Sequence, residues 1–162
     1  MDENAVVNES KQYIVVKLDN EQYGIDITFI DNIVRMQQIT RVPKAQSYFA
    51  GVINLRGEII PVMSLRTKFG LPDKEYTNAT RIIIVKPESN AKIGVLVDEV
   101  REVVALEDDN IEKAVYEEQG SNLLGVGKYN DTLISLLDIQ GVIHLAPEIA
   151  LDKIRFMLSA QV

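Results

Sequence analysis

Short runs of β-branched and aliphatic residues recur along the chain and are separated by polar or glycine-containing segments. In the first half these runs cover residues 13–18, 22–27, 39–42, 52–55 and 59–62, and in the second half residues 82–86, 93–97, 100–106 and 133–137. Short runs of this kind, bounded by turn-forming residues, are typical of β-strands. Their spacing predicts a mainly β protein built from small barrels.

One segment of the first half follows a helical pattern instead. Within residues 28–36, Thr28 and Asp31 have the spacing of a capping box. Apolar side chains then recur at helical spacing at Ile30, Ile33 and Val34. The sequence therefore predicts a short helix between the second and third strands.

Two further segments favour helix. Residues 64–69 can form a short helix that is capped by Ser64 and ended by Gly70. Residues 147–162 begin with a proline, which suits the first turn of a helix, and carry apolar side chains at helical spacing from Ala150 onward. We expect this C-terminal helix to pack on a barrel or to bridge two barrels.

The second half of the chain repeats the first. Residues 51–52 and 57–64 align without gaps with residues 125–126 and 131–138. Upstream, residues 23–24 align with 93–94, and residues 30–33 align with 97–100. These matches occur in the same order at offsets of about 67 to 74 residues, which predicts an internal duplication. Two related small barrels packed side by side are the expected result.

The segment 51–62 has the pattern of a β-hairpin whose tip is Arg56-Gly57. Glycine can adopt the positive φ that a tight turn requires, and the arginine is then left projecting from the tip. The aligned segment of the second half has Lys128-Tyr129-Asn130-Asp131 instead. The arginine tip therefore belongs to the first half alone and is a candidate functional feature.

Composition and charge exclude several classes of protein. The 162 residues are 46% hydrophobic and 25% charged, which is typical of a soluble globular domain. The chain has no cysteine, so disulfides and cysteine-ligated metals are excluded. A net charge of −7 argues against nucleic acid as a partner. Residues 1–11 are polar and resemble no secretory signal, so we expect a disordered tail and a cytoplasmic protein without membrane insertion.

No group of residues in the sequence indicates catalysis. The sole histidine, His144, lies near no nucleophile motif, and no phosphate-binding loop is present. Asp98 and Glu99 are adjacent on a predicted strand, so their carboxylates point to opposite faces. Residues 107–110 lack the spacing of a calcium loop. We therefore expect a binding module rather than an enzyme, with no cofactor and no metal.

A binding module needs apolar side chains that are accessible to a partner on a fixed frame. Ile27, Ile30 and Ile33 form a candidate stripe at the corner between the second strand and the predicted helix. The alternative is that these isoleucines are barrel core, and their periodicity alone favours the core.

Several motifs follow one another along most of the chain, from about residue 12 to residue 143. They are residues 23–27, 39–43, 51–57 and 60–62, Leu65-Arg66 with Phe69-Gly70, and Gly94 with Val97-Asp98 and Val100. In this order they resemble the CheW family of chemotaxis coupling proteins. The resemblance implies two tandem five-stranded barrels of the SH3-like type within a CheW-like domain over residues 12–146. Approximate subdomains are expected at residues 12–70 and 80–140, with terminal segments that can cross over. It also implies an adaptor without catalytic activity, which couples chemoreceptors to the histidine kinase CheA.

The resemblance further implies two sets of contact residues. The tip of the receptor's helical hairpin is expected to dock between the barrels, on Ile14, Ile27, Ile30, Ile33, Gly51, Arg56, Gly94 and Val100. The kinase's regulatory domain, which has the same two barrels, is expected to contact Met36, Ile39 and Val42 on the first barrel and Ile111 and Tyr116 on the second.

Two residues depart from the family pattern. Asn32 stands where many members carry a glutamate able to pair with the hairpin arginine, so Arg56 is left with a neutral hydrogen bond at best. Arg81 stands where other members often have an apolar residue.

Other functions remain open from the sequence. A CheW-like scaffold in a non-chemotaxis pathway with a CheA-type kinase would share this fold and these sites. A barrel that binds oligosaccharide or single-stranded nucleic acid is disfavoured, because aromatic residues make up only 6% of the chain and the net charge is negative.

Overall fold

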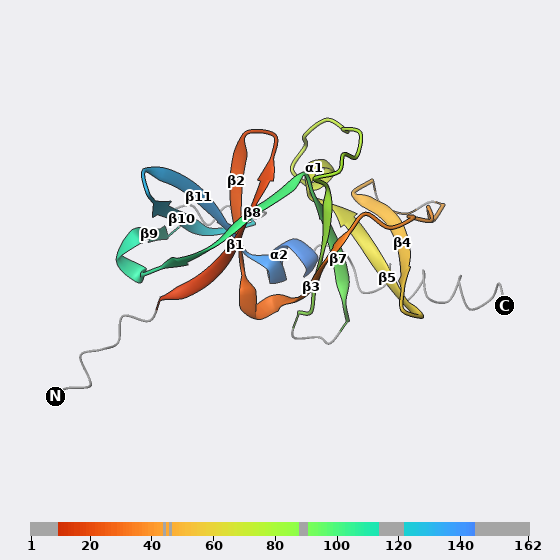
Figure 1. Ribbon diagram of the computed structural model, residues 1–162, viewed down its shortest axis with the longest axis horizontal. Helices are drawn as coiled ribbons and strands as arrows, with labels where there is room; N and C mark the ends of the chain where they lie inside the picture. The colour runs from red at the N-terminus through yellow and green to blue at the C-terminus, as the bar shows by residue number, and fades with distance from the viewer. Residues whose placement is uncertain (1–9, 44, 46, 88–90, 114–121, 145–162) are drawn as a thin grey trace.

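The computed structural model describes residues 10–43, 45, 47–87, 91–113 and 122–144 of the chain (Figure 1). Over these residues the fold is mainly β, as predicted. The strands are β1 (Lys11–Leu18), β2 (Glu21–Asp26), β3 (Ile30–Arg35), β4 (Phe49–Leu55), β5 (Glu58–Ser64), β6 (Arg81–Val85), β7 (Ile93–Val97), β8 (Glu99–Leu106), β9 (Ile111–Lys113), β10 (Leu123–Tyr129) and β11 (Thr132–Leu137). The helical elements are η2 (Ile27–Phe29), α1 (Leu65–Lys68), η3 (Asp108–Asn110) and α2 (Ile139–His144).

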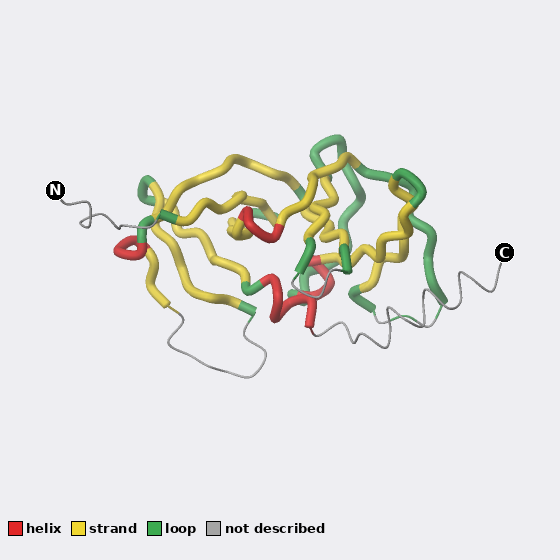
Figure 2. Tube along the Cα trace, turned by 90° about the horizontal axis from the view of Figure 1, so that it is seen from below, coloured by secondary structure: helices red, strands yellow, loops and turns green. Residues whose placement is uncertain are grey.

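The strands form two sheets of matching topology. In barrel A the strand order is β8-β1-β2-β11-β10-β9, and in barrel B it is β3-β6-β7-β5-β4. The β2–β11 and β7–β5 pairs are parallel, and every other pair of neighbouring strands is antiparallel. Strands β8-β1-β2-β11-β10 therefore correspond one to one with β3-β6-β7-β5-β4. This correspondence confirms the predicted repeat of two five-stranded units, to which barrel A adds β9 as a sixth strand, and Figure 2 shows the strands curling in each barrel.

The two sheets do not follow the predicted division at residues 12–70 and 80–140. Strands β1 and β2 belong to barrel A together with β8 to β11, whereas β3 to β7 form barrel B. Figure 1 shows the red β1 and β2 beside the blue β10 and β11. The chain enters barrel B through η2 and returns at Asp98, directly between β7 and β8. A hydrophobic pattern identifies a strand but not the strand that it pairs with. The sequence therefore allowed for a crossover of terminal segments without showing which strands cross over.

Three apolar cores hold the structure together. One core fills barrel A with Tyr13, Val15, Val104, Leu106, Ile134 and Leu136. Another fills barrel B with Ile53, Ile60, Val62, Ile82, Ile84 and Leu96. The third and largest lies between the barrels and joins residues of both with Ile139, Val142 and Ile143 of α2, the helix between the sheets in Figure 1. The barrels therefore share a continuous apolar core.

The predicted helix over residues 28–36 is wrong. Asp26 caps the single turn η2 by accepting a hydrogen bond from the Thr28 N–H (2.9 Å), and β3 follows directly. A β-bulge between Ile30 and Asn32 then shifts the register against β6. Because of this bulge, Ile30 and Ile33 lie on the same face of the strand although they are three residues apart. The spacing that resembled a helix is the spacing of a bulged strand.

The remaining expectations had mixed outcomes. The predicted strand at residues 39–42 is reduced to a single bridge between Thr40 and Val52. The helix predicted near residues 64–69 is confirmed as α1, and the Ser64 hydroxyl accepts a hydrogen bond from the Thr67 N–H (3.2 Å). The predicted tail at residues 1–11 lies almost wholly outside the described residues, and the C-terminal helix at 147–162 lies wholly outside them. Within the described residues, none of the helices has the length and apolar character to cross a membrane.

Candidate docking site

Five residues predicted to contact the receptor lie together over the core between the barrels. Ile14 is part of this core and only 8% exposed. Ile27, Ile30, Ile33 and Val100 are partly buried and pack against the same core. They come from β1, η2, β3 and β8, so both barrels contribute. We call these five residues the seam.

Cross-strand pairing fixes how β3 contributes to the seam. Ile30 lies opposite Val85 of β6, and Ile33 lies opposite Ile83. Both partners belong to the core between the barrels. Val34 instead packs against the interior core of barrel B. The bulge in β3 therefore directs two isoleucines to the seam and the next apolar residue into the barrel.

The seam continues onto an exposed valine that the sequence analysis did not select. Val103 of β8 lies opposite Ile14 of β1, so the two side chains share a face of the sheet. Val103 is 54% exposed, which is unusual for an aliphatic residue beside a core. The sequence could have predicted an outward-facing valine here, because only one of the neighbouring strand residues Val103 and Val104 can face the interior of a barrel.

The predicted arginine tip is present at the end of the β4–β5 hairpin. Arg56 and Gly57 have φ angles of 54° and 85°, and the Gly57 N–H donates a hydrogen bond to Asn54 Oδ1 (2.9 Å). Arg56 is exposed, and the described residues offer it no hydrogen bond or ion pair. Asn32 does not pair with it, because the Asn32 amide oxygen accepts a hydrogen bond from the Ile33 N–H (2.9 Å).

Three other charged groups join the hairpin tip to the seam. Lys92 Nζ lies 3.4 Å from Glu58 Oε2, next to the tip, and 3.6 Å from Asp31 Oδ2 at the start of β3. The hydrogen bond to Glu58 and the charge of Asp31 raise the pKa of Lys92. Asp31 and Glu58 are exposed and Lys92 is only partly buried, so the pairs contribute little stability. They do show that the tip of the hairpin lies close to the β3 end of the seam.

The two predicted glycines have structural roles. Gly51 has a φ of 144°, and a Cβ added there would lie 2.2 Å from the carbonyl oxygen of Thr40. A Cβ at Gly94 would lie 2.8 Å from Ile82 Cγ2. Both glycines are buried. Close approach of neighbouring groups accounts for both of them without any partner.

The residues predicted to contact the kinase are divided between the barrels. Met36 and Ile39 are partly buried and pack against the core of barrel B. Ile111 packs against the core of barrel A. Val42 is partly buried, and Tyr116 lies outside the described residues. The structure therefore does not gather this set at one place.

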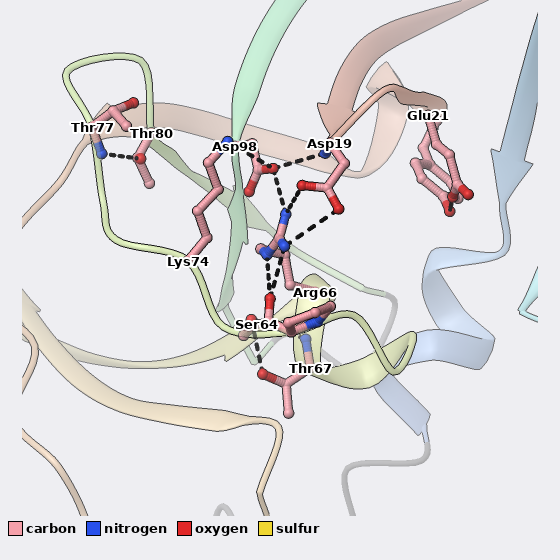
Figure 3. Close-up of polar contacts among 11 residues, drawn as sticks. Asp19, Glu21, Ser64, Arg66, Thr67, Lys74, Thr77, Thr80 and Asp98 are labelled. Atoms are coloured by element: carbon pink, nitrogen blue, oxygen red, sulfur yellow. Dashed lines mark hydrogen bonds and ion pairs between the residues drawn. The ribbon is translucent and has the colours of Figure 1, made fainter.

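An ionic cluster that is largely buried at Arg66 and Asp98 ties the barrels together (Figure 3). Arg66 of α1 in barrel B places Nη1 2.6 Å from Asp19 Oδ1, in the β1–β2 turn of barrel A. The same nitrogen lies 2.7 Å from Asp98 Oδ2, at the crossover between β7 and β8. Nε and Nη2 of Arg66 both donate to the carbonyl oxygen of Pro72, at 2.9 and 2.7 Å. We call Arg66, Asp19 and Asp98 the clasp.

The electrostatics of the clasp are mutually stabilising. The hydrogen bond from Arg66 lowers the pKa of Asp19, and the bond to Asp19 raises the pKa of Arg66. The Asp19 N–H also donates to Asp98 Oδ2 (2.8 Å). Arg66 and Asp98 have side chains only 11% and 15% exposed, so water screens this pair weakly. Both residues occur in the motifs that resemble the CheW family, but the sequence alone does not relate them to each other.

The described residues contain no group of three or more His, Cys, Asp or Glu residues placed to hold a metal ion. Asp98, which the sequence raised as a candidate acid, is engaged by Arg66. The partly exposed apolar side chains of the seam, with a free guanidinium close by, are instead what a protein partner can use.

Two SH3-like barrels with an apolar seam between them, one formed by a segment inserted between β2 and β8 of the other, define a two-barrel domain. The family of CheW-like domains matches residues 12–146, and the chain belongs to this family. The resemblance noted in the sequence is thereby confirmed.

Similar proteins agree with this assignment. The chain is 32% identical over 142 residues to the chemotaxis protein CheW of Bacillus subtilis (strain 168), a match that covers 86% of this chain and 90% of that protein. It is 33% identical over 137 residues to the chemotaxis protein CheW of Helicobacter pylori (strain ATCC 700392 / 26695), covering 83% and 82%. Its fold is similar to the crystal structure of the scaffolding protein TtCheW from Thermoanaerobacter tengcongensis, with a TM-score of 0.74, 33% identity, and coverage of 80% of this chain and 89% of that chain.

Proposed function

We propose that this chain is a non-enzymatic adaptor that couples methyl-accepting chemoreceptors to the histidine kinase CheA in bacterial chemotaxis. The observation that carries the proposal is the seam, where partly exposed apolar residues from both barrels lie over one core. Membership of the CheW-like family supports it. On this account the protein is cytoplasmic and is recruited to receptor arrays at the membrane through its partners.

The receptor side of the proposal is a helix packed on the seam. The cytoplasmic tip of a chemoreceptor is a helical hairpin, and helices dock on apolar surfaces through residues spaced three and four apart. Ile27, Ile30, Ile33 and Val100 supply the apolar contact, and Ile14 supports them from the core. Arg56 is the polar anchor, because its guanidinium has no partner among the described residues and is available to carboxylates or helix-end carbonyls.

The kinase side of the proposal uses a separate set of residues, with one contact on each barrel. The regulatory domain of a CheA-type kinase packs through Met36, Ile39 and Val42 on one barrel and through Ile111 and Tyr116 on the other. Met36 and Ile39 pack on the core of barrel B, and Ile111 packs on the core of barrel A. Each of these three is only partly buried, as a contact residue must be.

Coupling then follows from the packing between the barrels. The core under the seam joins both barrels, and the clasp joins the β1–β2 turn of barrel A to α1 of barrel B. A receptor helix on the seam and a kinase domain at a barrel end are therefore held in a defined relative position. The adaptor performs no chemistry and acts by maintaining this geometry.

The test is autophosphorylation of the CheA-type kinase from the same organism, with and without receptor membranes, as this chain is titrated in. Receptor control of the kinase is expected only when the chain is present. Ile30→Asp is expected to abolish receptor binding and to spare kinase binding, and Arg56→Ala to weaken receptor coupling with the fold intact. Leu133→Asp is the matched control, because Leu133 is 62% exposed on barrel A and lies outside the seam.

Three results would contradict the proposal. One is a kinase activity that does not respond to the chain at any concentration. Another is loss of both binding activities in Ile30→Asp, which would assign that isoleucine to the core alone. The third is equal loss of receptor binding in Leu133→Asp and Ile30→Asp, because the contact would then not be specific to the seam.

A further inference from the structure

Two arginines lie directly opposite each other in barrel B. The antiparallel register of β3 and β6 pairs Arg35 with Arg81. Side chains at directly opposed positions share a face of the sheet, and like charges in that arrangement repel each other. Arg81 is also one of the two residues that the sequence analysis names as departures from the family pattern. A repulsive pair at the end of two strands calls for an explanation.

Neither arginine is neutralised within the described part of the chain. Arg81 Nη1 donates to the carbonyl oxygens of Asn78 (2.7 Å) and Thr80 (2.9 Å), which orients its guanidinium without cancelling the charge. Arg35 is exposed, and no ion pair to either arginine occurs among the described residues. A shortage of acidic residues does not explain these missing ion pairs, because the chain has 24 Asp and Glu residues and 17 Lys and Arg residues. Arg66, by contrast, has two carboxylates within hydrogen-bond distance.

The two arginines line a cavity of about 540 Å³. Its other lining residues are Met36, Thr77, Asn78 and Thr80. The Thr77 N–H donates to Thr80 Oγ1 (2.8 Å), so the rim is an ordered turn (Figure 3). We call this cavity the arginine pocket.

A larger hollow of about 950 Å³ continues from the arginine pocket and shares Met36 and Thr80 with it. Its lining includes the apolar side chains of Ile39 and Leu96, the exposed cation Arg41, and Tyr76, which is 57% exposed. Charges of both signs also line it, at Arg66, Asp73, Lys74, Glu75 and Asp98. The two arginines of the arginine pocket therefore adjoin a mixed surface with apolar side chains, an exposed aromatic ring and charged groups. This combination is typical of a protein interface rather than of a site for a small anion.

We propose that the arginine pocket docks an acidic segment of a protein partner, in which carboxylates are flanked by apolar side chains. The guanidinium fork matches a carboxylate in two parallel hydrogen bonds, and Met36 and Ile39 receive the neighbouring apolar groups. A net charge of −7 disfavours anionic lipid surfaces and nucleic acid as the occupant. The inference rests on the proposed function in naming the partner, which is the regulatory domain of the CheA-type kinase.

The test is the affinity of this regulatory domain for the full chain at a low and a high NaCl concentration. The variants are Arg35→Gln, Arg81→Gln and the double variant, and Arg101→Gln is the control because Arg101 is exposed on β8 of barrel A. We expect the double variant to bind about tenfold more weakly at low salt and to lose most of the salt dependence. The control is expected to bind like the wild type.

Folding of the variants is measured in the same conditions. The double variant is expected to be at least as resistant to urea as the wild type, because a repulsive pair is removed. Weaker kinase binding by a variant of unchanged stability would therefore reflect the lost contact and not a lost fold.

The outcomes separate this inference from the proposed function. Wild-type affinity in the double variant, with receptor control of the kinase intact, would overturn the arginine pocket and leave the adaptor role standing. No binding of the regulatory domain by the wild-type chain would overturn both. Loss of receptor binding instead of kinase binding in the double variant would show that the proposal names the wrong partner for the pocket. Inorganic tripolyphosphate or phosphatidylglycerol vesicles can be tested in the same way. If they bind only when both arginines are present, and kinase binding is unchanged in the double variant, the pocket binds phosphate groups and the proposal is overturned.

Discussion

Removal of the clasp arginine should destabilise the protein markedly. Arg66→Ala deletes the guanidinium that bonds to Asp98, Asp19 and the carbonyl oxygen of Pro72. Asp98, whose side chain is only 15% exposed, would lose Arg66 and keep only the Asp19 N–H as a donor and the exposed Lys74, whose Nζ lies 4.0 Å away. Asp19 is more exposed and can regain water. Breaking a fully buried pair costs about 3–5 kcal/mol, so the lower end of that range, about 3 kcal/mol, is expected here.

The measurement is urea unfolding of the wild type, Arg66→Ala, Arg66→Lys and the exposed-site control Arg101→Ala. With a slope of about 2–3 kcal/mol/M, the Arg66→Ala midpoint should fall by about 1–1.5 M. Lysine keeps the charge but cannot bond to Pro72 and Asp98 with a planar fork, so Arg66→Lys should lose about half as much. A decrease below about 1 kcal/mol in Arg66→Ala, or an equal decrease in Arg101→Ala, would refute the clasp as a stabilising element.

Further predictions concern titration and backbone strain. Arg66 lowers the pKa of Asp19 below its ordinary value of 3.8. The stability that this pair contributes should therefore be complete above about pH 4 and decline as the pH falls further. Asp19→Asn should abolish that decline in acid unfolding curves. Burial, together with the hydrogen bond to Glu21, raises the pKa of Tyr23 above 10.0. Its phenol should therefore stay neutral and stabilising at a pH where free tyrosine ionises. An ultraviolet titration in which Tyr23 ionises like free tyrosine would contradict this. Gly57→Ala should lower the free energy of unfolding by about 1–2 kcal/mol, from its positive φ alone. Gly51→Ala should lower it by more, because a Cβ at residue 51 also meets the carbonyl oxygen of Thr40. Equal costs at the two glycines would show that the close approach to Thr40 carries no penalty.

Local features of the fold were predictable from the sequence. The β4–β5 hairpin with Arg56 and Gly57 at its tip follows from two apolar runs separated by a turn dipeptide. Short helix α1 follows from the Ser64 cap and the glycine at residue 70. The duplication was visible because equivalent strands kept similar residues at nearly constant offsets. Each of these signals is contained within a few residues or in a direct repeat.

Features that depend on tertiary pairing were not predictable in the same way. The bulge between Ile30 and Asn32 exists only in the register of β3 against β6, and without that register the spacing of the isoleucines resembles a helix. The clasp joins Arg66 to residues 47 and 32 positions away, and no local pattern relates them. The opposition of Arg35 and Arg81 has the same origin. The exchange of β1 and β2 into barrel A likewise depends on which strands pair.

The central claim is that a receptor helix docks on the seam, and methyl NMR of the folded chain tests it most directly. A fragment carrying the helical hairpin tip of a chemoreceptor from the same organism would be titrated into protein with labelled isoleucine, leucine and valine methyl groups. The account predicts saturable shifts at Ile27, Ile30, Ile33 and Val100, with Val103 affected at the margin. It also predicts that Leu124 and Leu133, which are exposed on barrel A, stay unchanged. Shifts confined to those two leucines, or no shifts with a fragment that is fully folded, would contradict the account.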